Sequence, residues 1–338
     1  MKAAAAFALR VFVLLLSLII VFMIAINVAG MNRAPAGTRL TAANLAAEAQ
    51  QAAAMLPPFL VYTFLISLVM VWIIQNSRWR GLKLIAALIF TFYGLMTITS
   101  QIESIVYLRA KMPPGLIKQL FLMGAVVAIL FVPIAVLIMG KIRSKEESPQ
   151  PECAFTPAGK AVRFAALAVV YVLLYYVFGF YVAWQNPELR LYYSGSTELT
   201  SFFEQMRSTV VTMPWMLPLQ FGRGLLWALF AYPVVRMLKT MRLETACAIA
   251  ALFGAWSFAL LMPNPLMPSS VARSHFWETL WCDLLLGAIV GWVLSGGARS
   301  QASPCGELQL DTIASKEKFY EGISPHSRDG AQSGLARE

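Results

Sequence analysis

Long apolar segments separated by short polar ones dominate the chain from end to end. Each segment, with its flanking residues, is long enough to cross a hydrocarbon layer of about 30 Å as a helix. The polar and apolar alternation of β-strands is missing, and a helix satisfies its own backbone hydrogen bonds in lipid. The pattern therefore predicts eight transmembrane helices, at residues 11–30, 58–75, 82–107, 119–139, 161–184, 221–237, 244–262 and 276–294.

The composition strengthens this prediction. Of the 338 residues, 59% are hydrophobic and 13% charged, and the mean hydropathy is +0.66. Soluble domains are about a quarter charged, so a soluble enzyme is excluded for most of the chain. We expect an all-α, polytopic integral membrane bundle over residues 1–298. Residues 299–338 are rich in Ser, Gly and charge without helical periodicity, which predicts a short disordered tail.

The first apolar segment has a second interpretation, as a cleaved signal peptide. A basic stretch precedes it, and Val28-Ala29-Gly30 faintly resembles a cleavage site. However, the apolar run from Val11 to Gly30 exceeds the roughly 7–15 residues of a signal-peptide core. We expect an uncleaved span.

The distribution of Lys and Arg predicts the orientation. With the N-terminus inside, thirteen of these residues flank the spans on the inner side and nine on the outer side, although the outer loops are longer. The positive-inside rule then predicts cytoplasmic termini, in what we expect to be a bacterial inner membrane. The net charge of +10 comes without a dense basic stripe interleaved with aromatics, so no nucleic-acid partner is expected.

Two long outer loops, 31–56 and 186–220, carry helix signals. Residues 41–55 are Ala-rich, which favours a short helix. The pattern Ser201-x-x-Glu204 resembles a capping box, followed by apolar residues on one helical face. This second helix lies either at the membrane interface or over the bundle.

Polar residues inside or beside spans are costly and indicate functional sites. With the predicted topology, most of them converge at the outer ends of spans that are far apart in sequence. Glu103, His275 and Glu278 are the candidate acid or base groups. The candidate substrate-binding residues are Gln101, Gln185, Arg190, Arg223, Asn264, Arg273 and Asp283.

The eighth span and the residues just before it contain several of the candidate functional side chains. His275, Glu278 and Cys282 fall on one helical face, because they are spaced by three and seven residues. Asp283 lies about 12 Å below His275 and is the deepest acid of the chain. It must be neutral, paired or facing water, and Arg223 is its candidate partner.

Each of these residues also has a structural interpretation. Glu278 can stabilise the positive end of its helix, and Arg190 and Arg223 can extend to the interface. Gln101 can bind a neighbouring helix. Packing is also the expected role of the aromatic and glycine motifs Tyr171, Tyr175, Tyr176 and Gly287-x-x-x-Gly291.

A metal ion held by Glu103, His275 and Glu278 is chemically possible. The spacing matches no known metalloprotease pattern, so neither a metal nor a cofactor is expected.

These residues predict an extracytoplasmic polar pocket that handles an amphipathic or lipid-linked anionic substrate. The clustered acid and base groups favour a membrane-embedded enzyme without deciding the class, and the expected partner is a membrane lipid or lipid-linked small molecule. The alternatives are a transporter or flippase for such a substrate, or a structural subunit without chemistry. Association of two copies through their helices is a further alternative.

Overall fold

The computed structural model describes residues 2–31, 42–142 and 156–296, which excludes the predicted tail. Within these ranges the chain forms helices and short turns, without a β-strand. The long helices are α1 (Lys2–Val28), α2 (Ala42–Asn76), α3 (Gly81–Tyr93), α5 (Leu116–Ile138), α6 (Pro157–Phe178), α9 (Met216–Met237), α10 (Arg242–Ser257) and α11 (Ser269–Ser295). Between them lie α4 (Thr99–Glu103), α7 (Pro187–Ser194), α8 (Phe202–Thr212), the π-helical turns η1 (Gly94–Ile98), η2 (Ser104–Leu108) and η4 (Gly179–Ala183), and the 3₁₀ turns η3 (Arg109–Lys111) and η5 (Phe258–Leu261).

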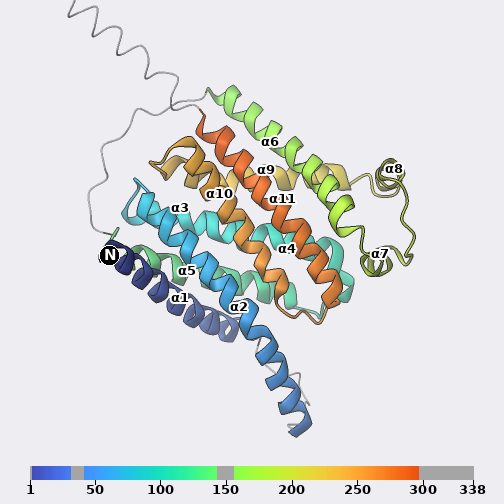
Figure 1. Ribbon diagram of the computed structural model, residues 1–338, viewed down its shortest axis with the longest axis horizontal. Helices are drawn as coiled ribbons and strands as arrows, with labels where there is room; N and C mark the ends of the chain where they lie inside the picture. Colours follow the sequence, from blue (N-terminus) through green and yellow to red (C-terminus); the bar gives the residue numbers. More distant parts are fainter. Residues whose placement is uncertain (1, 32–41, 143–155, 297–338) are drawn as a thin grey trace, which may run out of the picture. The chain divides into compact units, whose positions relative to one another are not determined.

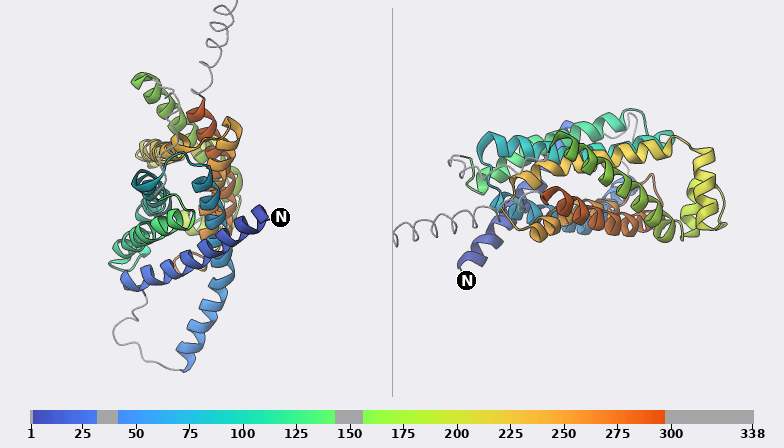
Figure 2. Two further views of the ribbon diagram at one scale, coloured as in Figure 1. Left: turned by 90° about the vertical axis from the view of Figure 1, so that its left-hand side faces the viewer. Right: turned by 90° about the horizontal axis from the view of Figure 1, so that it is seen from above.

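The long helices pack side by side as a closed ring (Figures 1 and 2). Successive neighbours around the ring are α1, α2, α10, α11, α6, α9, α3 and α5, which returns to α1. Helix α9 also contacts α10 and α11 across the ring. The enclosed core is apolar, and Leu18, Phe131 and Phe253 are among its fully buried side chains.

Seven of the described helices are long and apolar enough to cross a membrane, which confirms the predicted helical membrane bundle. The predicted span 221–237 is not among them. It forms α9, a helix of 22 residues that contains the polar side chains Gln220, Arg223 and Arg236. Gln220 and Arg223 are buried between neighbouring helices, so α9 does not expose them to the bundle surface.

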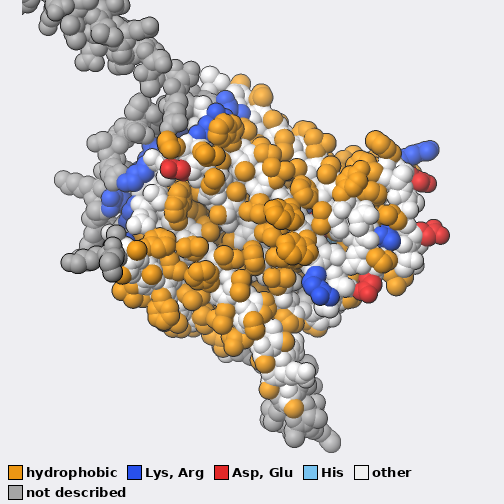
Figure 3. Space-filling model, viewed as in Figure 1, with side chains coloured by type: hydrophobic (Ala, Val, Ile, Leu, Met, Phe, Trp, Pro, Cys, Tyr) orange, Lys and Arg blue, Asp and Glu red, His pale blue; other side chains and the backbone are white. Residues whose placement is uncertain are grey.

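The surface of the bundle has an apolar middle between two charged ends. Apolar side chains cover the middle of the face in Figure 3, while Lys and Arg gather near the end that carries the start of α1. Acidic and basic side chains lie together at the opposite end, near α7 and α8. Such an apolar band between charged ends is typical of a membrane protein.

One predicted helix boundary was wrong, and one predicted span is irregular. The expected short helix at 41–55 belongs to α2, which continues through Pro57 and Pro58 to Asn76. The third predicted span is not a regular α-helix, because the π-helical turns η1 and η2 bracket α4. Ser201 caps α8 as predicted, accepting a hydrogen bond from the Glu204 backbone at 3.3 Å.

The predicted glycine motif packs α11 against α10. A Cβ atom at Gly287 would lie 2.6 Å from the Ile249 carbonyl oxygen, and one at Gly291 would lie 2.7 Å from the Ala246 Cα. Only glycine permits this approach of the two backbones. This face of α11 is therefore occupied within the chain, and the motif does not serve a helix-mediated oligomer.

Candidate functional site

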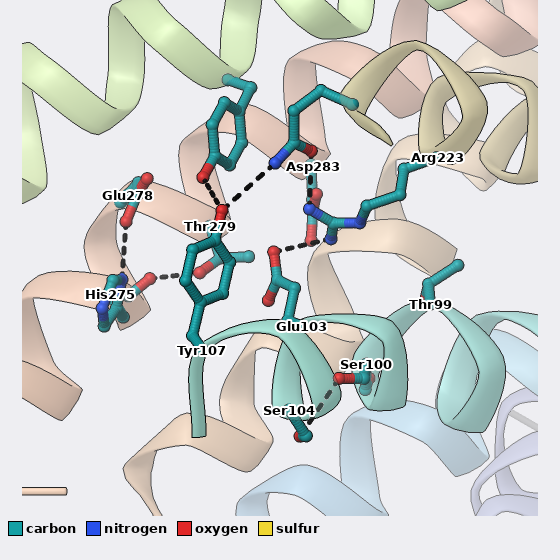
Figure 4. Close-up of polar contacts among 12 residues, drawn as sticks. Thr99, Ser100, Glu103, Ser104, Tyr107, Arg223, His275, Glu278, Thr279 and Asp283 are labelled. Carbon is teal, nitrogen blue, oxygen red and sulfur yellow. Dashed lines mark hydrogen bonds and ion pairs between the residues drawn. The ribbon is translucent and has the colours of Figure 1, made fainter. Parts of the chain in front are cut away.

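A buried cation with a carboxylate partner forms the first part of the site. Arg223 of α9 lies 2.6 Å from Glu103, the last residue of α4. The Arg223 side chain is 5% accessible and that of Glu103 is 43% accessible. Figure 4 shows Glu103 pointing toward Arg223, whereas Ser104 points away from it. The cation of the pair is therefore buried in the bundle, whereas its carboxylate is partly accessible.

Hydrogen bonds extend this ion pair to the next helices. Arg223 donates to the Gln220 side chain at 2.8 Å, and Gln220 donates to the Tyr107 hydroxyl at 3.4 Å. The Tyr107 hydroxyl also lies 2.7 Å from that of Tyr175 in α6. The Arg223 guanidinium stacks over the Tyr171 ring at 5.5 Å. Three helical segments thus fix the position of one cation.

His275 forms the second part, and both of its ring nitrogens have a partner. Nδ1 lies 2.7 Å from the Glu278 carboxylate one turn later on α11. Nε2 lies 3.0 Å from the hydroxyl of Tyr193 in α7. Because a carboxylate only accepts, Nδ1 carries the proton in the neutral ring, and Nε2 accepts from Tyr193.

Tyr193 is brought to His275 by α7, which is anchored to the start of α11. Asn186 caps α7 and donates to Ser274 at 2.9 Å. The Tyr192 hydroxyl donates to the Leu266 carbonyl at 2.6 Å. Burial raises the pKa of Tyr193 above its ordinary value, with smaller contributions from Tyr192 and nearby carboxylates. The Tyr193 hydroxyl therefore stays protonated and available as a donor at neutral pH.

The two parts meet at Tyr107 and Tyr193, whose rings pack edge to face with centroids 6.3 Å apart. Figure 4 shows Glu103, Tyr107, Arg223, His275 and Glu278 around a common space. We call these five residues, with Tyr193 and Gln220, the polar network. It combines the third predicted span, α7, α9 and α11 at the end of the bundle that carries α7 and α8 (Figure 1).

Asp283 lies deeper on α11, next to Arg223 (Figure 4). Its carboxylate accepts a hydrogen bond from Ser257 of α10 at 3.3 Å. Both side chains are buried. Asp283 therefore faces the interior of the bundle, as a polar residue at this depth requires.

The irregular helical turns coincide with the polar network. The turn η2 carries Tyr107 and follows Glu103 directly, and η4 approaches α11. A Cβ at Gly179, the first residue of η4, would lie 3.3 Å from the Glu278 carboxylate. Single π-helical turns are frequent at functional sites, because the extra residue reorients side chains.

The other predicted site residues lie elsewhere or bind backbone atoms. Arg190 is buried and donates to the Thr197 carbonyl at 2.9 and 2.7 Å, which holds the loop after α7. Gln185 donates to the Phe180 carbonyl at 2.8 Å, and Asn264 accepts from the Leu266 backbone at 2.9 Å. Arg273 is exposed. The Gln101 side-chain oxygen is buried without a hydrogen-bond partner.

The arrangement suits proton transfer better than metal binding. A histidine oriented by a carboxylate has the geometry that a general acid or base uses, and the second nitrogen of His275 contacts an exchangeable hydroxyl. Among the residues that the structure describes, no group of three His, Cys, Asp or Glu side chains could hold a metal ion.

Three residues of the polar network, Tyr107, Tyr193 and Gln220, were not predicted as site residues, and Tyr175 was predicted to serve packing. Tyr107 and Gln220 had a signal, because they lie four and three residues from Glu103 and Arg223 on the same helices. Tyr193 had none, since the contact depends on how α7 folds back onto α11.

Comparisons with known proteins add no family to this description. No protein-family model, curated protein or solved structure matches the chain.

Proposed function

We propose that the protein is a membrane-embedded enzyme that acts on the head group of an amphipathic or lipid-linked substrate. One observation carries the proposal: the His275 ring is held by Glu278 at Nδ1 and by Tyr193 at Nε2. A ring fixed in one orientation by a carboxylate is the arrangement that general acid–base catalysis requires. The apolar setting strengthens each of these interactions.

The chemistry proposed for His275 is transfer of a single proton. Glu278 keeps the proton on Nδ1, so Nε2 has the free electron pair. Tyr193 donates to this nitrogen in the resting site. A substrate hydroxyl or a water molecule replaces Tyr193 and transfers its proton to Nε2. The charge that develops on the head group is then stabilised by the adjacent Arg223.

The sequence predicted an anionic head group because of three arginines. The contacts of these arginines do not support a negative charge on the head group. Arg190 binds backbone carbonyls, Arg273 is exposed, and Arg223 has Glu103 as its counter-ion. The polar network of the described residues thus contains no unpaired arginine. Our proposal is therefore an amphipathic head group with an exchangeable proton, without an assigned charge.

The transporter alternative requires a polar path through the bundle. Below Asp283, α11 continues with Leu286, Val290 and Leu294, which are buried in the apolar core. Nothing on this face of α11 supports a path for a charged head group, so the enzyme is the better supported proposal.

Mass spectrometry of membrane lipids tests the proposal. Cells that express the protein are compared with cells that express His275→Gln at the same level. We expect at least one lipid or lipid-linked species to change with the wild type and to remain unchanged with the variant. Arg207→Gln is the control, because Arg207 is exposed on α8, away from the polar network. Identical profiles for the wild type and His275→Gln would contradict the proposal.

A further inference from the structure

A cavity of about 520 Å³ lies at the turn between the third predicted span and α5. Ile105 and Arg109 line it from the end of that span, and Ile117 and Lys118 line it from the first turn of α5. Met112 contributes from the connecting turn. Apart from the two cations, these lining residues are apolar. The cavity is separate from the polar network, because none of the residues that line it belongs to that network.

The backbone of the connecting turn is restricted, which favours a preformed cavity. Two consecutive prolines, Pro113 and Pro114, restrict the backbone. Gly115 follows with φ of 86°, a conformation that favours glycine. The Leu116 backbone donates to the Pro113 carbonyl at 3.2 Å and closes the turn.

The depth of the cavity matches that of lipid phosphates. One membrane-spanning segment ends at Lys111 and the next begins at Leu116. The cavity thus lies where the hydrocarbon layer gives way to the head groups. A ligand there meets apolar walls on one side and water on the other.

Two cations at this depth give the cavity its charge. Arg109 and Lys118 are exposed, and neither side chain forms an ion pair or hydrogen bond within the described ranges. Lys111 differs from them, because its ammonium group lies 3.2 Å from the centre of the Tyr192 ring. No acidic residue lines the cavity. Basic pockets at helix ends bind lipid phosphates in this way.

We propose that this cavity binds an anionic phospholipid. Its phosphate lies between Arg109 and Lys118, and the first part of an acyl chain packs against Ile105, Met112 and Ile117. The apolar walls favour a lipid over a free phosphate ion, since a free ion would gain nothing from them. This site is independent of the chemistry proposed at His275.

Native mass spectrometry of the full chain, released from nanodiscs of equal phosphatidylglycerol and phosphatidylcholine, tests the proposal. We expect the wild type to retain phosphatidylglycerol in preference to phosphatidylcholine. The double variant Arg109→Gln/Lys118→Gln should bind it about 25-fold more weakly, because each cation near the lipid surface contributes roughly fivefold. Arg207→Gln should retain it fully. A wild type without this preference, or a double variant that retains as much lipid, would overturn the proposal.

A second arm distinguishes a lipid from free phosphate. Inorganic phosphate in excess should leave the retained phosphatidylglycerol in place, and Ile117→Asp should release it although both cations remain. If inorganic phosphate displaces the lipid from the wild type, or if Ile117→Asp has no effect, the site does not recognise the acyl chain and the lipid assignment is wrong.

Discussion

Glu103 and Arg223 come from helices far apart in the sequence, and their charged groups approach to 2.6 Å. The carboxylate faces an accessible space while the guanidinium is buried, so the two ends of this ion pair have different environments. This asymmetry makes the roles of the two side chains separable by mutation. The buried cation depends on its partner more than the partly accessible carboxylate does.

Glu103→Gln should destabilise the protein by about 1–3 kcal/mol, because it leaves Arg223 buried without its counter-ion. The accessible position of Glu103 keeps the loss below that of a fully buried pair. Adding Arg223→Met should recover part of this stability, since the buried charge is then removed. Thermal unfolding in detergent measures both effects. Strictly additive losses in the double variant would mean that the two side chains do not interact.

Tyr193→Phe should preserve the fold and remove the donor at Nε2 of His275. Because burial raises the pKa of Tyr193, its hydroxyl remains protonated above the ordinary tyrosine range. Folding therefore favours the protonated form, and stability is lost as the pH rises from the ordinary tyrosine pKa toward the raised one.

Absorbance of tyrosinate checks this assignment. Between pH 9 and 11, the wild type and Tyr193→Phe should show the same increase. An increase that is larger in the wild type by one tyrosine would mean that Tyr193 is not shielded from water.

Gly287→Ala and Gly291→Ala should each destabilise the bundle by about 1–3 kcal/mol, because the added methyl group overlaps the α10 backbone. Gly222→Ala is the matched control. It also lies within a long helix, but a Cβ atom there meets nothing within 4 Å, so the substitution should be neutral or stabilise the helix slightly. Unfolding temperatures compare the three variants. Equal effects at all three positions would contradict the close packing of α10 and α11.

The predicted orientation places the loop between α7 and α8 outside the cytoplasm. In a background without native cysteines, Ser196→Cys should react with an impermeant maleimide in intact cells. Met241→Cys, an exposed residue at the start of α10, should react only after permeabilisation. The reverse labelling pattern would mean that the orientation in the membrane is opposite to the predicted one.

The long helices could be predicted from the sequence, because apolar runs of bilayer length have few other solutions. Local signals such as the Ser201 cap also gave correct positions. The exceptions have physical reasons. The predicted helix at 41–55 and the predicted span at 58–75 are one helix, because α2 continues through Pro57 and Pro58. The π-helical turns beside Glu103 depend on packing against other helices and leave no pattern in the sequence.

The polar network was predictable in part. The position of each residue within its span predicted that Glu103, Arg223, His275 and Glu278 lie at one end of the bundle. In the structure, Glu103 and Arg223 pair directly. Depth alone does not determine which helices are neighbours or which way a side chain points. For this reason Arg190 was assigned to substrate although it binds the Thr197 carbonyl, and Tyr193 was overlooked.

Cryo-electron microscopy of His275→Gln in nanodiscs of native membrane lipids tests the central claim most directly, because this variant should bind the substrate without converting it. We predict density for a head group in contact with Tyr193 and residue 275, with Glu103 and Arg223 facing the same space. A map in which Glu103, Arg223 and Glu278 face acyl chains, or in which Tyr193 lies away from residue 275, would contradict the account.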